Sequence, residues 1–203
     1  MKQVLIYRDF EERYEYSLGA NEKLQVVFCD ISTKDLATDF IFNLGEGAEV
    51  EFVGAALKYG KAQCKINYHA RHVGAESKSS FVLNSLLDDS AKKRSEMRIS
   101  FLPGAINANG SEHENCSLLS NETQNISLPR IDTREENMRG EHGMSSGHIP
   151  PEQVEYLRMR GFDDESIKRI CVHAGLNQVF SKIRDDDVLQ YLKGQLAEYE
   201  GRA

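Results

Sequence analysis

The sequence predicts a mainly β protein with a small α-helical segment at its C-terminal end, and three observations lead to this prediction. Short apolar runs, separated by turn residues, recur about every 10 to 15 residues through residues 1–130. No helical segment long enough for a βαβ unit lies between these runs. Beyond Pro150 and Pro151 the apolar residues change to helical spacing.

The apolar runs are typical of strands. Two of the segments, 23–32 and 97–102, alternate apolar and polar residues with the period of two that a half-buried strand requires. Between the runs lie residues that favour turns, including Gly54 and the Asn109-Gly110 pair. A sandwich, a barrel and a β-helix all fit this pattern, because periodicity alone does not separate them. In chain order the runs are 4–7, 24–29, 40–44, 50–53, 64–68, 81–87 and 97–102.

Two helices are predicted directly after the proline pair. Pro151 suits the first turn of a helix, and Glu152 complements the helix dipole at that end. Gly161 is a typical stop for this first helix. The acidic residues 163–165 then open a second helix, which we expect to end at Gly175.

A third helix is predicted to begin at residues 185–187, because an apolar stripe at helical spacing follows them. The stripe consists of Val188, Leu189, Leu192 and Leu196. We therefore expect two domains, a β core at residues 1–148 and a C-terminal helical domain at residues 149–203.

Charge and composition exclude several classes of protein. The chain has 25 Lys and Arg against 32 Asp and Glu, a net charge of −7, and no basic run, so we expect no nucleic-acid partner. No stretch approaches the roughly 20 apolar residues of a membrane span, and the N-terminal residues lack a secretory apolar region. We therefore expect a cytoplasmic protein with no membrane partner. The 4 cysteines lie far apart without a CxxC pair, which disfavours a zinc knuckle and a disulfide scaffold.

Two pairs of potential metal ligands lie in the β segment. His69 and His72 are three residues apart, so on a strand they would point to opposite faces, which disfavours a shared metal. His113 and Cys116 have the same spacing and would chelate a metal only if the backbone turns between them. The alternative for Cys116 is a small buried apolar side chain.

A third group lies close to the proline pair. Glu141 and His142 place a carboxylate beside an imidazole, which offers acid–base or metal-binding chemistry. Gly140 and Gly143 on either side permit close approach of the backbone, although a polar loop has the same composition. No Ser/His/Asp arrangement, P-loop or dinucleotide-binding glycine motif occurs, so we predict a protein without enzymatic activity and without an ATP site of its own.

Residues 141–149 and 152–162 together resemble a known family. A Glu-His-Gly turn, a short spacer and a helix ending in Tyr-Leu-x-x-Arg-Gly are similar to the C-terminal signature of the SufB/SufD family, the scaffold proteins of the SUF iron–sulfur cluster assembly system. Upstream, residues 129–132 resemble the family's Pro-x-Leu/Ile-Glu strand. The resemblance is clear over residues 95–183, whereas residues 1–60 carry no motif of the family.

The resemblance implies an architecture that composition does not decide. Family members have a right-handed parallel β-helix core followed by a C-terminal helical domain, and they dimerise through the β-helix. The resemblance therefore implies a second copy of this chain, or a SufB/SufD-type homologue, as dimer partner. Typical members also carry an N-terminal helical domain to which nothing in this sequence corresponds.

The resemblance also implies site residues. The family's Glu-His pair carries over onto Glu141 and His142, which we expect beside a transient iron–sulfur cluster. Thr133 stands where SufB proteins have a cysteine, so the chain looks more like SufD or a reduced, ancestral-type member. Cys116 is the expected thiolate contributor, because a solenoid turn of roughly 20 to 30 residues would place it beneath His142.

For the helical domain the resemblance implies docking of SufC, an ABC-type ATPase. The expected docking and packing residues are Tyr156, Leu157, Phe162, Val179 and Phe180. Two other functions stay open. The first is an interaction or regulatory subunit that binds the ATPase but holds no cluster, and the missing cysteine favours it. The second is a metalloenzyme on a β-barrel, which the absence of a three-ligand spacing disfavours.

Overall fold

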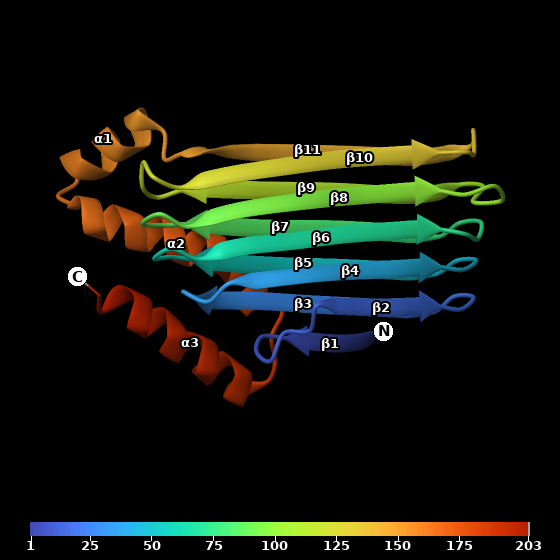
Figure 1. Ribbon diagram of the computed structural model, residues 1–203, viewed down its shortest axis with the longest axis horizontal. Coiled ribbons are helices and arrows are strands. Elements are labelled where there is room, and N and C mark those ends of the chain that lie inside the picture. Colours follow the sequence, from blue (N-terminus) through green and yellow to red (C-terminus); the bar gives the residue numbers. More distant parts are fainter. Residues whose placement is uncertain (203) are drawn as a thin grey trace.

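The computed structural model describes residues 1–202, and in it a series of strands precedes three helices (Figure 1). The strands are β1 (Lys2–Ile6), β2 (Arg13–Leu18), β3 (Lys23–Ser32), β4 (Leu36–Leu44), β5 (Glu49–Lys58), β6 (Gln63–His72), β7 (Lys78–Leu87), β8 (Lys92–Phe101), β9 (Ala108–Leu118), β10 (Gln124–Thr133) and β11 (Met138–His148). The helices are α1 (Pro151–Met159), α2 (Asp164–Phe180) and α3 (Asp186–Glu200).

The strands build two parallel sheets that face each other (Figure 1). Odd-numbered strands form a 6-stranded sheet in the order β1-β3-β5-β7-β9-β11, and even-numbered strands form a 5-stranded sheet in the order β10-β8-β6-β4-β2. Because consecutive strands alternate between the sheets and all neighbours run parallel, the chain winds into a β-solenoid of about 5 turns. The predicted mainly β fold with a parallel β-helix core is therefore confirmed.

Two predicted turns are wrong, because Gly54 and the Asn109-Gly110 pair lie inside strands β5 and β9. Glycine is needed there for packing. A Cβ on Gly54 would stand 2.7 Å from the Phe52 ring and 2.9 Å from Leu83. A Cβ on Gly110 would stand 2.8 Å from Ile99.

Each of the seven predicted apolar runs overlaps a strand, but four further strands are present, namely β2, β9, β10 and β11. Their sequences are polar, and they join the solenoid because the neighbouring turn supplies their backbone hydrogen bonds. The N-terminal β2 pairs in parallel with β4 in the same way.

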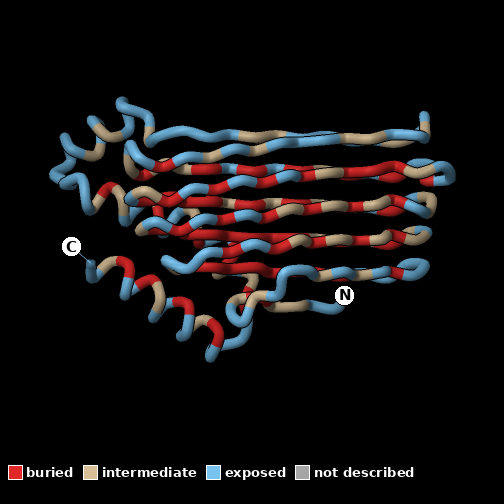
Figure 2. Tube along the Cα trace, in the orientation of Figure 1, coloured by how far each residue is buried: buried red, intermediate tan, exposed pale blue. Residues whose placement is uncertain are grey.

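The interior of the solenoid is a stack of aromatic rings in its early turns. Figure 2 shows buried residues in the strands up to β9 and none in β10 and β11. Phe28, Phe52 and Phe81 follow one another on the 6-stranded sheet, with Phe40 and Tyr68 facing them from the 5-stranded sheet. Neighbouring ring centroids lie 4.3 to 6.2 Å apart, so the rings are in direct contact along the stack. The last two strands, by contrast, are mostly exposed or half-buried.

Helices α2 and α3 cover part of the outer face of the 6-stranded sheet, so this sheet is apolar on both faces where the helices pack. Helix α2 packs on β5 and β7, and α3 packs on β3. Their buried residues form one cluster with the outward residues of the strands. No residue of α1 is buried, and this helix stands at the end of the stack beside β11 (Figure 1).

The helix limits confirm the predicted starts and correct one stop. Asp163 and Asp185 are the N-caps of α2 and α3, and their side chains accept backbone N–H groups of the first turn. Gly161 follows α1 with a φ of 90°. The predicted stop at Gly175 is wrong, since α2 continues to Phe180; a Cβ on Gly175 would stand 2.9 Å from Leu86, so glycine lets the helix approach β7 closely.

Within the described residues, none of the helices combines the length and the apolar character that crossing a bilayer requires.

Candidate functional site

The interior of the solenoid becomes polar in its last two turns, where the expected site residues lie. Strand β8 directs Lys93 and Ser95 inward, and β9 directs Glu112, Glu114 and Cys116 inward, all of them buried. The cause is the period of two along each strand, which sends alternate residues into the interior. We call these five residues, with the inward residues of β10 and β11, the polar end.

One half of the polar end is a satisfied network of charges and hydroxyls. The Lys93 ammonium and the Glu114 carboxylate form an ion pair with 0% and 1% of their side chains exposed. The Ser95 hydroxyl donates to Glu114 Oε2 at 2.9 Å, and the Lys93 ammonium donates to Asn125 Oδ1 at 3.3 Å. Burial lowers the pKa of Lys93, whose charge the neighbouring carboxylate compensates.

The other half holds a carboxyl group without partners. Glu112 is 1% exposed, and neither of its carboxylate oxygens has a hydrogen-bond partner among the described residues. Burial raises the pKa of this carboxyl group to about 8. The hydroxyl of Tyr68, which is also buried and unpartnered, has its pKa raised by burial and by the charge of Glu112.

His142 lies next to Glu112 on the neighbouring strand, because the register of β11 against β9 pairs these two residues. Residues of β11 on either side show which way His142 faces. A Cβ on Gly140 would stand 3.1 Å from Phe101 and 3.3 Å from Ile131, both interior residues. Met144 packs against the interior cluster. His142, midway in this alternation, therefore faces the interior on the same side as Glu112.

Glu141 faces the opposite way. It points to the outer side of the 6-stranded sheet, forms an exposed ion pair with Arg139 at 3.5 Å, and lines a shallow hollow with Lys78 and Ser111. Adjacent residues of a strand must point to opposite faces, so the two members of the predicted Glu141–His142 pair do not share a face.

Cys116 is buried, and the structure does not bring it to His142 within one chain. It pairs in register with Ser146, which lies four residues beyond His142 and hence about 13 Å along the strand. Burial raises the pKa of the Cys116 thiol, while the charge of Lys93 acts in the opposite direction. Cys116 is thus one solenoid turn from β11, as expected, but beneath Ser146.

The remaining histidines have structural surroundings. His72 is buried, with Ser77 Oγ at 2.8 Å and Ser79 Oγ at 2.9 Å from its two ring nitrogens, and burial lowers its pKa to about 4. His69 faces outward beside Ser100 Oγ at 2.9 Å, so the two do point to opposite faces. No group of three or more His, Cys, Asp or Glu residues with metal-binding geometry is present in the described part of the chain.

The residues expected at the partner surface divide between core and surface. Tyr156 and Phe162, on and just after α1, are 49% and 41% exposed, and Met159 between them is 75% exposed. Leu157 is half-buried, as is Phe180, whereas Val179 is fully buried against the sheet. We call Tyr156, Met159 and Phe162 the α1 patch.

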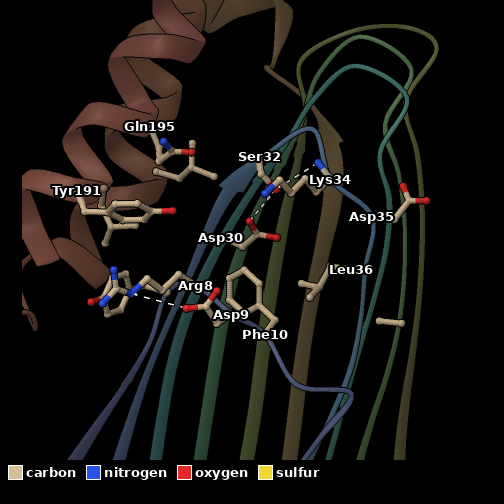
Figure 3. Close-up of a pocket in the computed structure, with 14 residues that line it drawn as sticks. Arg8, Asp9, Phe10, Asp30, Ser32, Lys34, Asp35, Leu36, Tyr191 and Gln195 are labelled. Atoms are coloured by element: carbon tan, nitrogen blue, oxygen red, sulfur yellow. Dashed lines mark hydrogen bonds and ion pairs between the residues drawn. The ribbon is translucent and has the colours of Figure 1, made fainter.

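A separate hollow of about 330 Å³ lies at the other end of the molecule, between the β1–β2 connection, β3 and α3 (Figure 3). Asp30 and Ser32 face Tyr191 and Gln195 across it. The Asp30 carboxylate is satisfied by the buried Lys58 ammonium at 2.6 Å and by the Ser32 hydroxyl at 2.8 Å. This charge pair is therefore part of the core.

Sequence reasoning missed Lys93, Glu112 and Glu114. The signal that points to the two glutamates is the alternation in the segment 111–116, where Glu112, Glu114 and Cys116 recur with period two and so share a face. An inward-facing Glu is rare enough in a strand interior to single out the polar end.

Comparison with known proteins adds one family and one distant relative. Residues 12–175 match the family described as "SUF system FeS cluster assembly, SufBD core domain". The chain is also 19% identical over 154 residues to the iron–sulfur cluster assembly protein SufD of Escherichia coli (strain K12). That alignment covers 76% of this chain and 36% of the relative, so the chain spans about a third of the relative's length.

Proposed function

Because the chain belongs to the SufB/SufD family of the SUF iron–sulfur cluster assembly system, we propose that it is a scaffold subunit on which an iron–sulfur cluster forms transiently. The observation that supports this proposal best is the polar end, where an inward imidazole lies beside an unpartnered carboxyl group at the last turn of the solenoid. In this proposal the chain itself is not an enzyme, works in the cytoplasm and binds neither nucleic acid nor membrane.

The donor groups at this end fit iron as cargo. Imidazole and carboxylate ligands suit ferrous iron, and a thiolate suits an iron–sulfur cluster. We place the cluster next to His142, with Cys116 as a further contributor to be tested; Glu141, which faces the outer side of the sheet, is not part of this proposed site. Few ligands from one chain favour exchangeable binding, which a scaffold that passes its cluster on requires.

Anaerobic reconstitution with ferrous iron and sulfide tests the cluster. We expect the wild-type chain to retain both, as read by absorbance and by chemical analysis of iron and sulfide. His142→Ala and Cys116→Ser should each reduce the retained amount. If both variants retain as much as the wild type, these residues are structural, and the chain is an interaction subunit.

We propose that the chain dimerises with a second copy or with a SufB/SufD-type homologue. Strands β10 and β11 end their sheets and lie together at one end of the stack, and the described residues place no strand beyond them (Figure 1). Unpaired strand edges are open to pairing with another chain, and a two-fold partner would cover them.

We propose a SufC-like ABC-type ATPase as the second partner, docked on the α1 patch. Three large apolar side chains stand exposed there on a helix without a buried residue, which is the surface expected of a docking site. Tyr156→Ala combined with Phe162→Ala should abolish copurification with the ATPase. Tyr191→Ala, at a similarly exposed tyrosine of α3, is the matched control and should leave it unchanged.

The alternative function is an interaction or regulatory subunit that binds the ATPase but holds no cluster. The observation in its favour is Thr133, which stands where SufB proteins have a cysteine. Its hydroxyl donates to the Glu135 carbonyl at 2.6 Å and so closes a turn. ATPase binding without any retained iron or sulfide would establish this alternative.

A further inference from the structure

We propose that Glu112, and not Glu141, is the carboxylate that binds iron together with His142. This inference rests on the proposed scaffold function and assigns the ligand pair of that site. Glu112 comes from β9 and His142 from β11, so the pair joins two successive turns of the solenoid.

Register and direction bring the two side chains together. Glu112 and His142 are paired residues of neighbouring parallel strands, which lie about 4.8 Å apart. Both face the interior, as Gly140 and Met144 show for β11 and as the burial of Glu114 and Cys116 shows for β9. Glu141 lies on the other side of the sheet, and β11 would have to exchange its two faces for Glu141 to reach an iron bound between Glu112 and His142.

The hydrogen bonding of Glu112 separates it from the other buried carboxylates. Glu114, two residues further on the same strand, is ion-paired with Lys93 and accepts from Ser95. Asp30 is likewise held by Lys58 and Ser32. Glu112 alone among these three has two buried oxygens without a donor. Buried polar groups are nearly always paired, so a buried carboxyl group without a hydrogen-bond donor requires an explanation, and a bound cation provides one.

The chemistry of the pair selects the ligand. One imidazole nitrogen and one carboxylate suit ferrous iron better than magnesium or calcium, which prefer oxygen ligands alone. The described residues add no third ligand in the same chain, so the remaining positions are open to water, sulfide or a residue of a second copy. Because β11 is the last strand of its sheet and His142 is exposed, iron reaches Glu112 by way of the His142 ring.

Ferrous iron alone, without sulfide, is the probe. Anaerobic calorimetric titration of the full chain compares the wild type with Glu112→Gln, Glu141→Gln and His142→Ala. We expect Glu112→Gln and His142→Ala each to weaken iron binding by roughly tenfold or more. Glu141→Gln, the matched control one residue from His142, should bind like the wild type. Cobalt(II) as a spectroscopic substitute should lose its nitrogen-ligand signature only in His142→Ala.

Thermal melting of each variant separates loss of a ligand from loss of the fold. Glu112→Gln removes a buried acid without changing its shape and should melt no lower than the wild type; Glu112→Leu is the second variant if the amide does not fold. Folded Glu112 variants that bind iron as tightly as the wild type overturn the inference. If Glu141→Gln weakens binding and Glu112→Gln does not, the inference fails and the scaffold function stands. If His142→Ala also binds normally, the proposed cluster site itself fails.

Discussion

At Glu112 the residue type at an inward position of a strand determines whether that position belongs to the apolar core or to the candidate site. The residues in register with it toward the N-terminus are apolar: Phe81, Phe52 and Val26, which are buried, and Val4, which is half-buried. At the fifth position of this column the side chain becomes a carboxyl group, and at the sixth it becomes the imidazole of His142. The same backbone geometry thus holds an aromatic stack at one end and two polar ligands at the other.

The first prediction concerns the pH dependence of stability at Glu112. Its pKa is raised from 4.5 to about 8, so the folded chain holds a proton that the unfolded chain releases between these values. Stability from this group is therefore complete below pH 4.5 and is lost as pH rises toward 8. Relative to Glu112→Gln, the free energy of unfolding of the metal-free wild type should fall with pH, with a limiting slope of about 1.4 kcal/mol per pH unit.

Urea unfolding of both proteins at several values between pH 5 and 8, with a chelator present, measures this difference. All other titrating groups are common to the two proteins, so their contribution cancels. A difference that stays constant over this range would contradict the raised pKa.

The second prediction compares two glycines with opposite surroundings. A Cβ on Gly74 would stand 2.1 Å from the backbone nitrogen of Glu46, so Gly74→Ala must push two solenoid turns apart. We expect a loss of about 3 kcal/mol in the free energy of unfolding. Gly194 in α3 has nothing within 4 Å of such a Cβ, so Gly194→Ala should gain about 1 kcal/mol from helix propensity. If denaturant unfolding gave the same change in the free energy of unfolding for Gly74→Ala and Gly194→Ala, the added Cβ at Gly74 would not push the two turns apart, and the prediction would be wrong.

At the scale of elements, the sequence predicts those helix limits that depend on neighbouring residues alone. The caps Asp163 and Asp185 and the stop at Gly161 act within one turn of helix, so they were correctly read from neighbouring residues. The role of Gly175 was not predictable in this way. Its reason is the Leu86 side chain on β7, which is distant in sequence.

The apolar pattern does not predict the polar strands β9, β10 and β11 for a related reason, and only residues 129–132 of β10 are expected as a strand, through the family resemblance. Their apolar residues are too few for an alternation signal, and their ladder hydrogen bonds come from strands about 30 residues away. The motif around Glu141 and His142 predicts one shared site as long as β11 is not known to be a strand. Once β11 is known, period two assigns them to opposite faces.

The third prediction contrasts two parts of the helical segment. Leu176 of α2 is 1% exposed in the cluster that joins the helices to the 6-stranded sheet, so Leu176→Ala should cost about 2 to 5 kcal/mol. Tyr156 of α1 is 49% exposed, and Tyr156→Ala should change stability by about 0.5 kcal/mol at most. Chemical denaturation compares the two. A large loss in Tyr156→Ala would mean that α1 is part of the core and not a free docking surface.

At the scale of the whole molecule, the two ends of the solenoid differ. The N-terminal end closes with short strands, β1 of 5 residues and β2 of 6, and with the connection that lines the hollow beside α3. The C-terminal end finishes with strands of 10 and 11 residues and an exposed, polar last turn. Composition did not distinguish a β-helix from a sandwich, because both are built of short strands and differ only in which distant strands pair.

The last prediction tests the proposed dimer at this C-terminal end. Long strands without a neighbour are prone to pair with another chain, and pairing across a two-fold axis removes that exposure. Gly147 lies on β11, and nothing lies within 4 Å of a Cβ built on it, so Gly147→Glu is tolerated by the single chain. In a dimer formed through β11 the same side chain would bring a charge into the interface.

Sedimentation equilibrium at micromolar concentration should therefore show a dimer for the wild type and a monomer for Gly147→Glu. Gly194→Glu is the matched control, because Gly194 is equally uncrowded but lies on α3, away from β11, and it should remain dimeric. Unchanged circular dichroism in both variants shows that the monomer is intact. A monomeric wild type, or a Gly147→Glu variant that stays dimeric, would place the contact elsewhere, and the polar end would then be open to a different partner.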